Sequence, residues 1–149
     1  DLAGRGFTLA SLLDFYEQLF EGEVMPSFQP ARSTTNDVVR QAIVPMSRTD
    51  AGGFALATVW NEGRLVLAQR MVTHSWSNRF ADLVAALVTD GLGLSSSYYS
   101  SVSIRLAEPG GLDVLRKALG RIGGLRITYG PAPQEGTVER DAWERKRID

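Results

Sequence analysis

The stretch that most restricts the fold of this chain is residues 71–83, which read Met-Val-Thr-His-Ser-Trp-Ser-Asn-Arg-Phe-Ala-Asp-Leu. An apolar run ends in a polar cluster, and the pattern of an amphipathic helix begins at once. We therefore predict a strand, a turn and a helix in direct succession. His74, the only histidine of the chain, lies at this junction. Because ligands in α/β folds bind where strands end and helices begin, the junction predicts the position of a site.

Two segments in the first third of the chain have helical periodicity. Residues 8–20 repeat apolar side chains three and four positions apart and start at Thr8, a good N-cap. Residues 34–44 begin with a capping box at Thr34, and Pro45 is expected to stop this second helix. The pattern predicts an N-terminal pair of helices.

The second half of the chain contains further helical patterns. In residues 78–90 the apolar side chains recur at i, i+3, i+4 and i+7, and this helix should end at Gly91. A shorter helix is predicted for residues 112–119. Residues 102–106 alternate apolar and polar positions, which leaves two alternatives open: a short strand, or part of a helix that starts at Tyr98.

Four segments favour β-strands. Residues 54–60 and 64–68 flank a short loop that contains glycine, which predicts a hairpin. Residues 71–74 are expected to form the central, buried strand of the sheet, and residues 125–129 a further strand. Residues 130–149 carry two prolines and alternating charges with little apolar periodicity, so we predict an exposed charged tail or a short solvated helix.

The composition limits the classes of partner. A length of 149 residues fits one domain. Sixteen basic and seventeen acidic side chains give a net charge of -1, which is too small to attract nucleic acid or an anionic membrane. No apolar run approaches the ~20 residues of a membrane span. One histidine and no cysteine leave too few ligands for zinc, and we predict no metal or cofactor.

The residues after the predicted central strand are the candidate ligand site. A neutral His74 imidazole could act as a general base or donate to a ligand, and Trp76 could stack on a ligand ring. Asn78 and Arg79 lie in the first helical turn, where backbone N–H groups and a guanidinium can hold an anion. The simpler interpretation is that His74 caps the strand and that Trp76 closes the end of a core.

The carboxylates of the first helix have a pattern of their own. They follow helical spacing and are most simply interpreted as a solvated face: Asp14, Glu17, Glu21 and Glu23. Residues 139–147 mix basic and acidic side chains, so this segment neutralises itself and is a poor nucleic-acid surface.

Residues 70–87 resemble the first strand and helix of Toll/interleukin-receptor-like (TIR-like) domains. Those domains often show an apolar strand, a cluster of the type Ser/Thr-His/Tyr-Ser, and a helix with Phe and Leu on one face. The resemblance implies a Rossmann-like sheet and either a signalling interaction or the binding of a nicotinamide ligand. Some TIR-like members cleave NAD with a glutamate, and no later position of this chain clearly supplies one.

A longer resemblance covers residues 12–129. The chain is similar to a large, uncharacterised protist family in which four motifs follow one another. They are Met-Pro-x-Phe at 25–28, Asp-Val-Val-Arg at 37–40, Ile-Val-Pro-x-Ser at 43–47 and Val-Thr-His-x-Trp-x-Asn-x-Phe at 72–80. This resemblance implies an α/β domain and carries no established activity.

We therefore predict an α/β fold: a small Rossmann-like or TIR-like sheet with flanking helices. Residues 1–129 would form a single domain with a helical N-terminal part at 1–50, and residues 130–149 a tail. The chain starts with Asp1, which allows that it is a fragment.

Three functional hypotheses remain open. The first is a protein-interaction or signalling module, with a protein partner or self-association. The second is a nucleotide- or NAD-binding hydrolase-type enzyme with its site near His74. The third is a truncated or inactive relative of such a domain. No nucleic-acid or membrane partner is expected, and the absence of cysteine is compatible with the cytoplasm.

Overall fold

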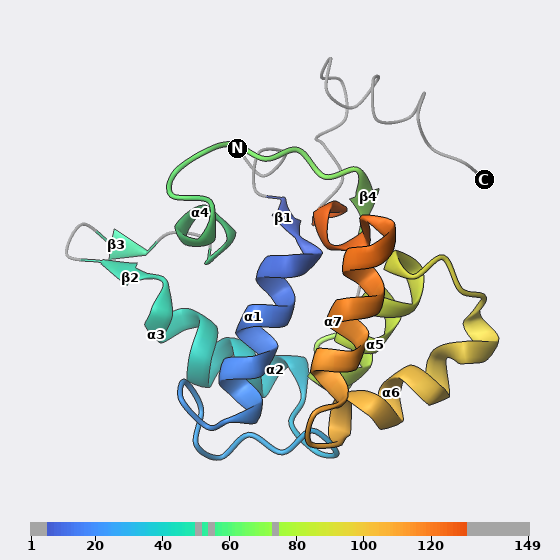
Figure 1. The fold of residues 1–149 in the computed structure, drawn as a ribbon. Helices are drawn as coiled ribbons and strands as arrows, with labels where there is room; N and C mark the ends of the chain where they lie inside the picture. Colours follow the sequence, from blue (N-terminus) through green and yellow to red (C-terminus); the bar gives the residue numbers. More distant parts are fainter. Residues whose placement is uncertain (1–5, 50–51, 54–55, 73–74, 131–149) are drawn as a thin grey trace.

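The structure is a computed structural model that describes residues 6–49, 52–53, 56–72 and 75–130. These residues are mostly helical, and the predicted α/β class is wrong. Figure 1 shows α1 (Leu9–Phe20) and α7 (Gly111–Ile122) lying side by side, with α5 (Phe80–Gly91) behind them and α6 (Tyr99–Ala107) at one side. The four helices contact one another and enclose most of the core.

The first helix forms as its sequence predicts. The Thr8 hydroxyl accepts the backbone N–H of Ser11 at 3.1 Å, which satisfies one of the unpaired donors at the start of α1. The apolar positions recur on one face, and that face is buried: Leu9, Leu12, Leu13, Phe15, Tyr16 and Leu19. The prediction of a helix over residues 8–20 is confirmed.

The second helix has the predicted start and a different end. Thr34 and Asp37 form the reciprocal capping box of α2 (Thr35–Val38). Instead of stopping at Pro45, the helix widens into a π-helical turn, η2 (Val39–Ile43), and continues as α3 (Val44–Met46). The Val44 N–H donates to the Val39 carbonyl, five residues earlier in place of the usual four. The carbonyls before Pro45 are therefore displaced from their α-helical positions, where the proline ring would clash with them.

The helices of the second half differ from prediction mainly at their ends. Residues 78–90 correspond to α5, and residues 112–119 to the longer α7. The open alternative at 102–106 is resolved as helix, because α6 follows a 3-10 turn, η3 (Ser96–Tyr98). Helix α5 ends at Gly91 as predicted, but Gly91 is its last helical residue and not a left-handed residue after it. It is buried inside the last turn, where a Cβ atom would lie 2.6 Å from Leu9 Cδ2.

The main sheet is small, and its central strand is not the predicted one. The order is β1 (Phe7–Thr8), β5 (Thr128–Gly130), β4 (Arg70–Met71), with β1 antiparallel and β4 parallel to β5. The segment predicted to be central supplies the edge strand β4, and Met71 is 46% exposed. The central position belongs to β5, whose Tyr129 is buried. The prediction of a buried central strand is therefore wrong for residues 71–72, and residues 73–74 lie outside the described residues.

The predicted hairpin at 54–68 is also wrong. Residues 56–60 form a helix, α4 (Leu56–Trp60), and the hairpin pairs β2 (Arg48–Thr49) with β3 (Gly52–Gly53) instead. Leu56 and Trp60 are four positions apart, so a helix turns both toward the core. The Trp60 ring packs edge-on against Phe7 at 6.0 Å between centroids. A short apolar run has no periodicity that distinguishes a strand from a helix, so tertiary packing decides which of the two forms.

Two predictions fall partly or wholly outside the described residues. Residues 131–149, most of the predicted tail, are not described, so the tail and the domain boundaries stay predictions.

Among the described residues, no helix is both long enough and apolar enough to cross a membrane.

Candidate functional site

The segment that carries the predicted ligand site runs past the start of α2, and His74 itself lies outside the described residues. The carbonyls of Asn78 and Trp76 accept the backbone N–H groups of Thr35 and Asn36 at 2.8 and 2.9 Å. These two amides belong to the first turn of α2, and without these hydrogen bonds they would be free to bind an anion. The side chains of Trp76 and Asn78 are exposed, that of Trp76 by 59%. Trp76 therefore does not close the core.

The Arg79 side chain is already paired with a carboxylate in the first turn of α5. Its guanidinium meets the Asp82 carboxylate through two hydrogen bonds of 2.9 and 3.1 Å. The first helical amide of α5, at Phe80, donates to the Ser33 carbonyl at 3.0 Å. A ligand role for His74, Trp76, Asn78 and Arg79 stays a prediction.

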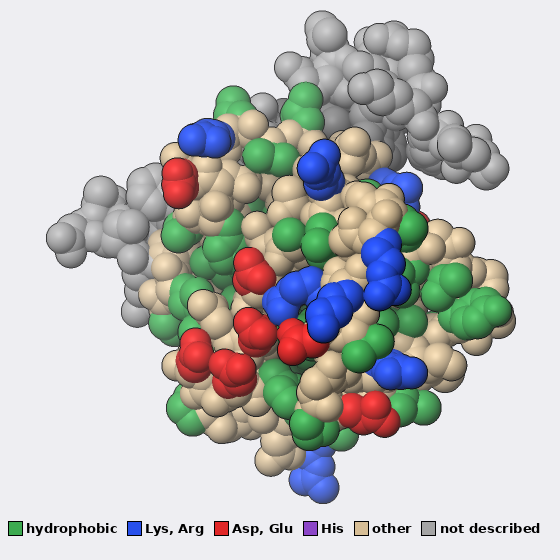
Figure 2. All heavy atoms as spheres, in the orientation of Figure 1, with side chains coloured by type: hydrophobic (Ala, Val, Ile, Leu, Met, Phe, Trp, Pro, Cys, Tyr) green, Lys and Arg blue, Asp and Glu red, His purple; other side chains and the backbone are tan. Residues whose placement is uncertain are grey.

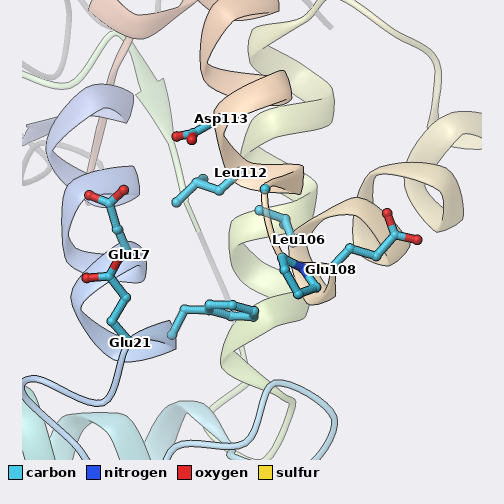
Figure 3. A pocket seen from close by; sticks show the side chains of 9 residues that line it. Glu17, Glu21, Leu106, Glu108, Leu112 and Asp113 are labelled. Atoms are coloured by element: carbon cyan, nitrogen blue, oxygen red, sulfur yellow. The ribbon is translucent and has the colours of Figure 1, made fainter.

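A different concave site lies between α1 and the corner that joins α6 to α7 (Figure 3). Its volume is about 250 Å³. Apolar side chains line part of it: Phe20, Leu106, Pro109 and Leu112. Gly110 and four carboxylates line the rest: Glu17, Glu21, Glu108 and Asp113. Figure 3 shows Glu17 and Glu21 on the α1 side and Asp113 on the α7 side, with the Glu108 side chain directed away from α1. We call this site the acidic pocket.

The corner behind the acidic pocket depends on two glycines and a tyrosine. Gly110 has a φ of 78°, a left-handed conformation that glycine adopts without strain. At Gly111 a Cβ atom would lie 1.7 Å from the Arg105 carbonyl oxygen, so only glycine lets α7 start this close to the end of α6. The buried Tyr16 hydroxyl donates to the Leu106 carbonyl at 3.1 Å and holds α1 against the same corner. Burial raises the pKa of Tyr16 to about 12.

Arg116 offsets the negative charge at one end of the acidic pocket. Its guanidinium lies 3.2 Å from Asp14, 3.4 Å from Glu17 and 3.3 Å from Asp113, so it joins α7 to α1. Because all three carboxylates are partly exposed, each contact contributes little by itself. The geometry nevertheless shows that these carboxylates accept a guanidinium.

The other end of the acidic pocket has an excess of negative charge. A side-chain hydrogen bond with Glu23 raises the pKa of Glu21, and repulsion from Glu17 and further carboxylates adds to the effect. Within the described ranges, Glu21, Glu23 and Glu108 form no ion pair. A cation placed at this end would relieve the repulsion.

The lining of the acidic pocket combines carboxylates with apolar side chains. No histidine, serine, cysteine or lysine lines it. In the part of the chain that the structure describes, no three His, Cys, Asp or Glu side chains are placed to hold a metal ion. Carboxylates beside an apolar wall suit a side chain that has an apolar stem and a positive end.

A second polar cluster joins the sheet to α5. The Tyr129 hydroxyl donates to Asp90 Oδ2 at 2.6 Å, and Arg70 forms an ion pair with the same carboxylate. Burial, followed by the hydrogen bond to Asp90, raises the pKa of Tyr129. The cluster attaches β4 and β5 to the C-terminal end of α5, which is a structural role.

Sequence reasoning interpreted the carboxylates of the first helix as a solvated face and missed the acidic pocket. The opposite wall comes from residues about 90 positions later, and no local pattern links the two. One signal was available: residues 9–20 contain acidic side chains and no Lys or Arg, whereas residues 111–122 contain Arg116, Lys117 and Arg121. Opposite charges on two separate amphipathic helices suggest that they face each other.

Comparison of the chain with protein-family models, with curated protein sequences and with solved structures gives no match. The resemblances to TIR-like domains and to the protist family therefore stay predictions as to family.

Proposed function

We propose that this protein is a protein-interaction module that binds a basic, partly apolar segment of a partner protein in the acidic pocket. The observation that carries the proposal is the combination of an apolar wall with carboxylates from two helices around one concavity. The volume of about 250 Å³ lies below the roughly 300–1,000 Å³ of a typical small-molecule site. A single side chain of a partner is a better match in size than a cofactor.

The charges favour arginine or lysine as the inserted side chain. Glu21 has no cationic partner among the described residues, and its neighbours repel its negative charge. Phe20 is 37% exposed at the pocket and can take the aliphatic stem or the flat face of a guanidinium. Arg116 provides an intramolecular precedent, since it already bridges Glu17 and Asp113.

The other two hypotheses have no comparable support. An enzyme that binds a nucleotide or NAD would use His74, which lies outside the described residues, together with side chains that are exposed. The hypothesis of a truncated or inactive relative predicts no particular arrangement of side chains. Both stay predictions.

The proposal predicts that Glu21→Lys weakens the binding of a basic peptide. A fluorescent peptide that alternates arginine and leucine should bind the wild-type protein, and a glutamine-for-arginine version should not. Glu21→Lys replaces an attraction with a repulsion, so we expect roughly three- to tenfold weaker binding by anisotropy, as for exposed charge pairs. Glu62→Lys makes the same charge change on an exposed residue away from the pocket and serves as the control. Equal losses in both variants would show attraction to the overall charge only and would overturn the proposal.

The same binding should depend on pH through Glu21. The pKa of this carboxyl lies above its usual value, so Glu21 loses its charge at a higher pH than an ordinary glutamate as the solution is acidified. Arginine stays positive throughout. We therefore expect affinity to fall as the pH drops from about 7 to about 4, with an early phase that comes from Glu21. Glu21→Gln should bind more weakly at neutral pH and lack that phase. An unchanged pH profile in Glu21→Gln would count against the role of this residue.

A further inference from the structure

The acidic pocket has carboxylates that the described residues leave without a cation. Figure 2 shows acidic side chains gathered over α1 and Lys and Arg side chains over α7. Arg116 of α7 pairs with Glu17 and Asp113 at one end of the pocket. Glu21 and Glu108, which also line the pocket, form no ion pair within the described ranges. The proposed function therefore requires a cation from a segment that is not part of the pocket wall.

The chain itself contains one segment with the matching composition. Residues 145–148 read Arg-Lys-Arg-Ile, and we call them the basic segment. Residues 145–147 are the only three consecutive basic residues in the sequence. Glu144 and Asp149 flank the basic segment with one acid on each side, so it keeps a net positive charge. Bases followed by an isoleucine match the carboxylates and the apolar wall of the acidic pocket.

The length of the chain after β5 allows the basic segment to reach the pocket of its own molecule. Thr128 of β5 pairs with Thr8, which is also the N-cap of α1. The acidic pocket lies at the other end of α1, a helix of 12 residues that is about 18 Å long. Residues 131–144 can span up to roughly 50 Å. The difference leaves room to turn back toward the pocket, which is necessary because β5 runs antiparallel to β1 and so away from α1.

We propose that the basic segment occupies the acidic pocket of the same molecule and competes there with the partner protein. The inference rests on the proposed function and adds a regulator of that site. Because the basic segment and the pocket belong to one chain, each pocket experiences an effective concentration on the order of 1 mM of the segment. A contact made of exposed ion pairs is weak between separate molecules, and at this concentration it is populated. The partner then binds only the fraction of molecules whose pocket is open, and its apparent affinity falls by that fraction.

Neutralising the basic segment should strengthen the binding of the peptide that alternates arginine and leucine. The segment-neutral variant combines Arg145→Gln, Lys146→Gln and Arg147→Gln in the full chain. We expect about two- to fivefold tighter binding by anisotropy, because the pocket is then open in nearly all molecules. Thermal melts should show that the variant folds as the wild type does. Unchanged or weaker binding in the folded variant would overturn the inference.

A charge control is necessary because the segment-neutral variant is also more negative overall. The control replaces three exposed arginines that do not line the acidic pocket: Arg40, Arg64 and Arg126, each with glutamine. It has the same net charge as the segment-neutral variant and should gain less affinity for the peptide. An equal gain in both would show attraction to the overall charge and would overturn the inference.

Combined variants test whether the basic segment acts at the pocket. In the Glu21→Lys background the pocket attracts the basic segment less, so neutralising the segment should raise peptide affinity much less than in the wild type. In the Glu62→Lys background, which has the same charge change away from the pocket, the full gain should remain. The same gain in both backgrounds would mean that the segment acts elsewhere on the surface, which contradicts the proposal.

The contact is intramolecular, so it should not depend on protein concentration. In sedimentation velocity the wild-type protein should keep the mass of a monomer as its concentration rises. A mass that rises in the wild type and not in the segment-neutral variant would show the basic segment entering the pocket of a second copy, and the intramolecular contact would be wrong.

The outcomes separate this inference from the proposed function. If the peptide binds the wild-type and segment-neutral chains equally, and both depend on Glu21, the interaction function stands and the competing segment is excluded. If the peptide binds the segment-neutral chain without dependence on Glu21, or does not bind it, the proposed function fails and the inference fails with it. Tighter binding that depends on Glu21 supports both.

Discussion

Replacing Gly111 with alanine is expected to destabilise the protein by about 3 kcal/mol, at the upper end of the usual cost of overpacking. The new Cβ atom would lie 1.7 Å from the Arg105 carbonyl oxygen. A backbone oxygen cannot rotate away as a side chain can, so α6 and α7 would have to separate. For a chain of this length, such a loss corresponds to a fall in melting temperature of roughly 6–12 °C.

The matched control lies in the same helix. Gly120 is exposed in α7, and the nearest atom to its added Cβ is Leu125 Cδ1 at an ordinary 3.7 Å. Gly120→Ala should therefore stabilise the protein by about 0.5–1 kcal/mol, the usual gain in a helix interior. Urea unfolding measures both changes. A Gly111→Ala variant as stable as the wild type would mean that α6 and α7 do not meet as closely as the structure shows.

Replacing Phe15 with alanine is expected to cost about 3–5 kcal/mol of unfolding free energy. The Phe15 side chain is 2% exposed, and its ring centroid lies 5.5 Å from that of Trp60 and 5.9 Å from that of Phe80. Its removal leaves a cavity where α1, α4 and α5 meet. Phe15 thus lies in a core enclosed by helices, whereas the sequence predicted a core formed against an α/β sheet.

Phe20 in the same helix gives a comparison with identical chemistry. It is 37% exposed at the acidic pocket, so Phe20→Ala should cost less than about 1 kcal/mol of stability. The same variant should weaken binding of the basic peptide, which Phe15→Ala should do only by unfolding the protein. Similar losses of stability in both variants would contradict the orientation of α1.

Local features of the sequence were sufficient for several elements. The N-cap at Thr8 and the capping box at Thr34 depend on residues within one turn, and both are present. The apolar stripe of α5 spans three turns, so its period could be recognised without knowledge of its neighbours. Such elements carry their own signal because the interactions that start them are close in sequence.

The sheet and the acidic pocket depended on distant residues. The segment at 71–74 has the composition of a buried strand, yet β4 lies at the edge because β5, about 60 residues later, takes the centre. The short run at 56–60 became a helix because Trp60 packs on Phe7 and Phe15. Neither outcome is visible in a window of a few residues.

The amino-acid sequence by itself determined where the principal helices start and which of their faces are apolar, since capping and periodicity act over one or a few turns. Only the tertiary structure decided that helices rather than a sheet enclose the core, and that Glu17 and Glu21 face Asp113 across a concavity. The physical reason is that burial and charge pairing act between residues brought together from about 100 positions apart. Those contacts exist only once α1 and α7 have packed.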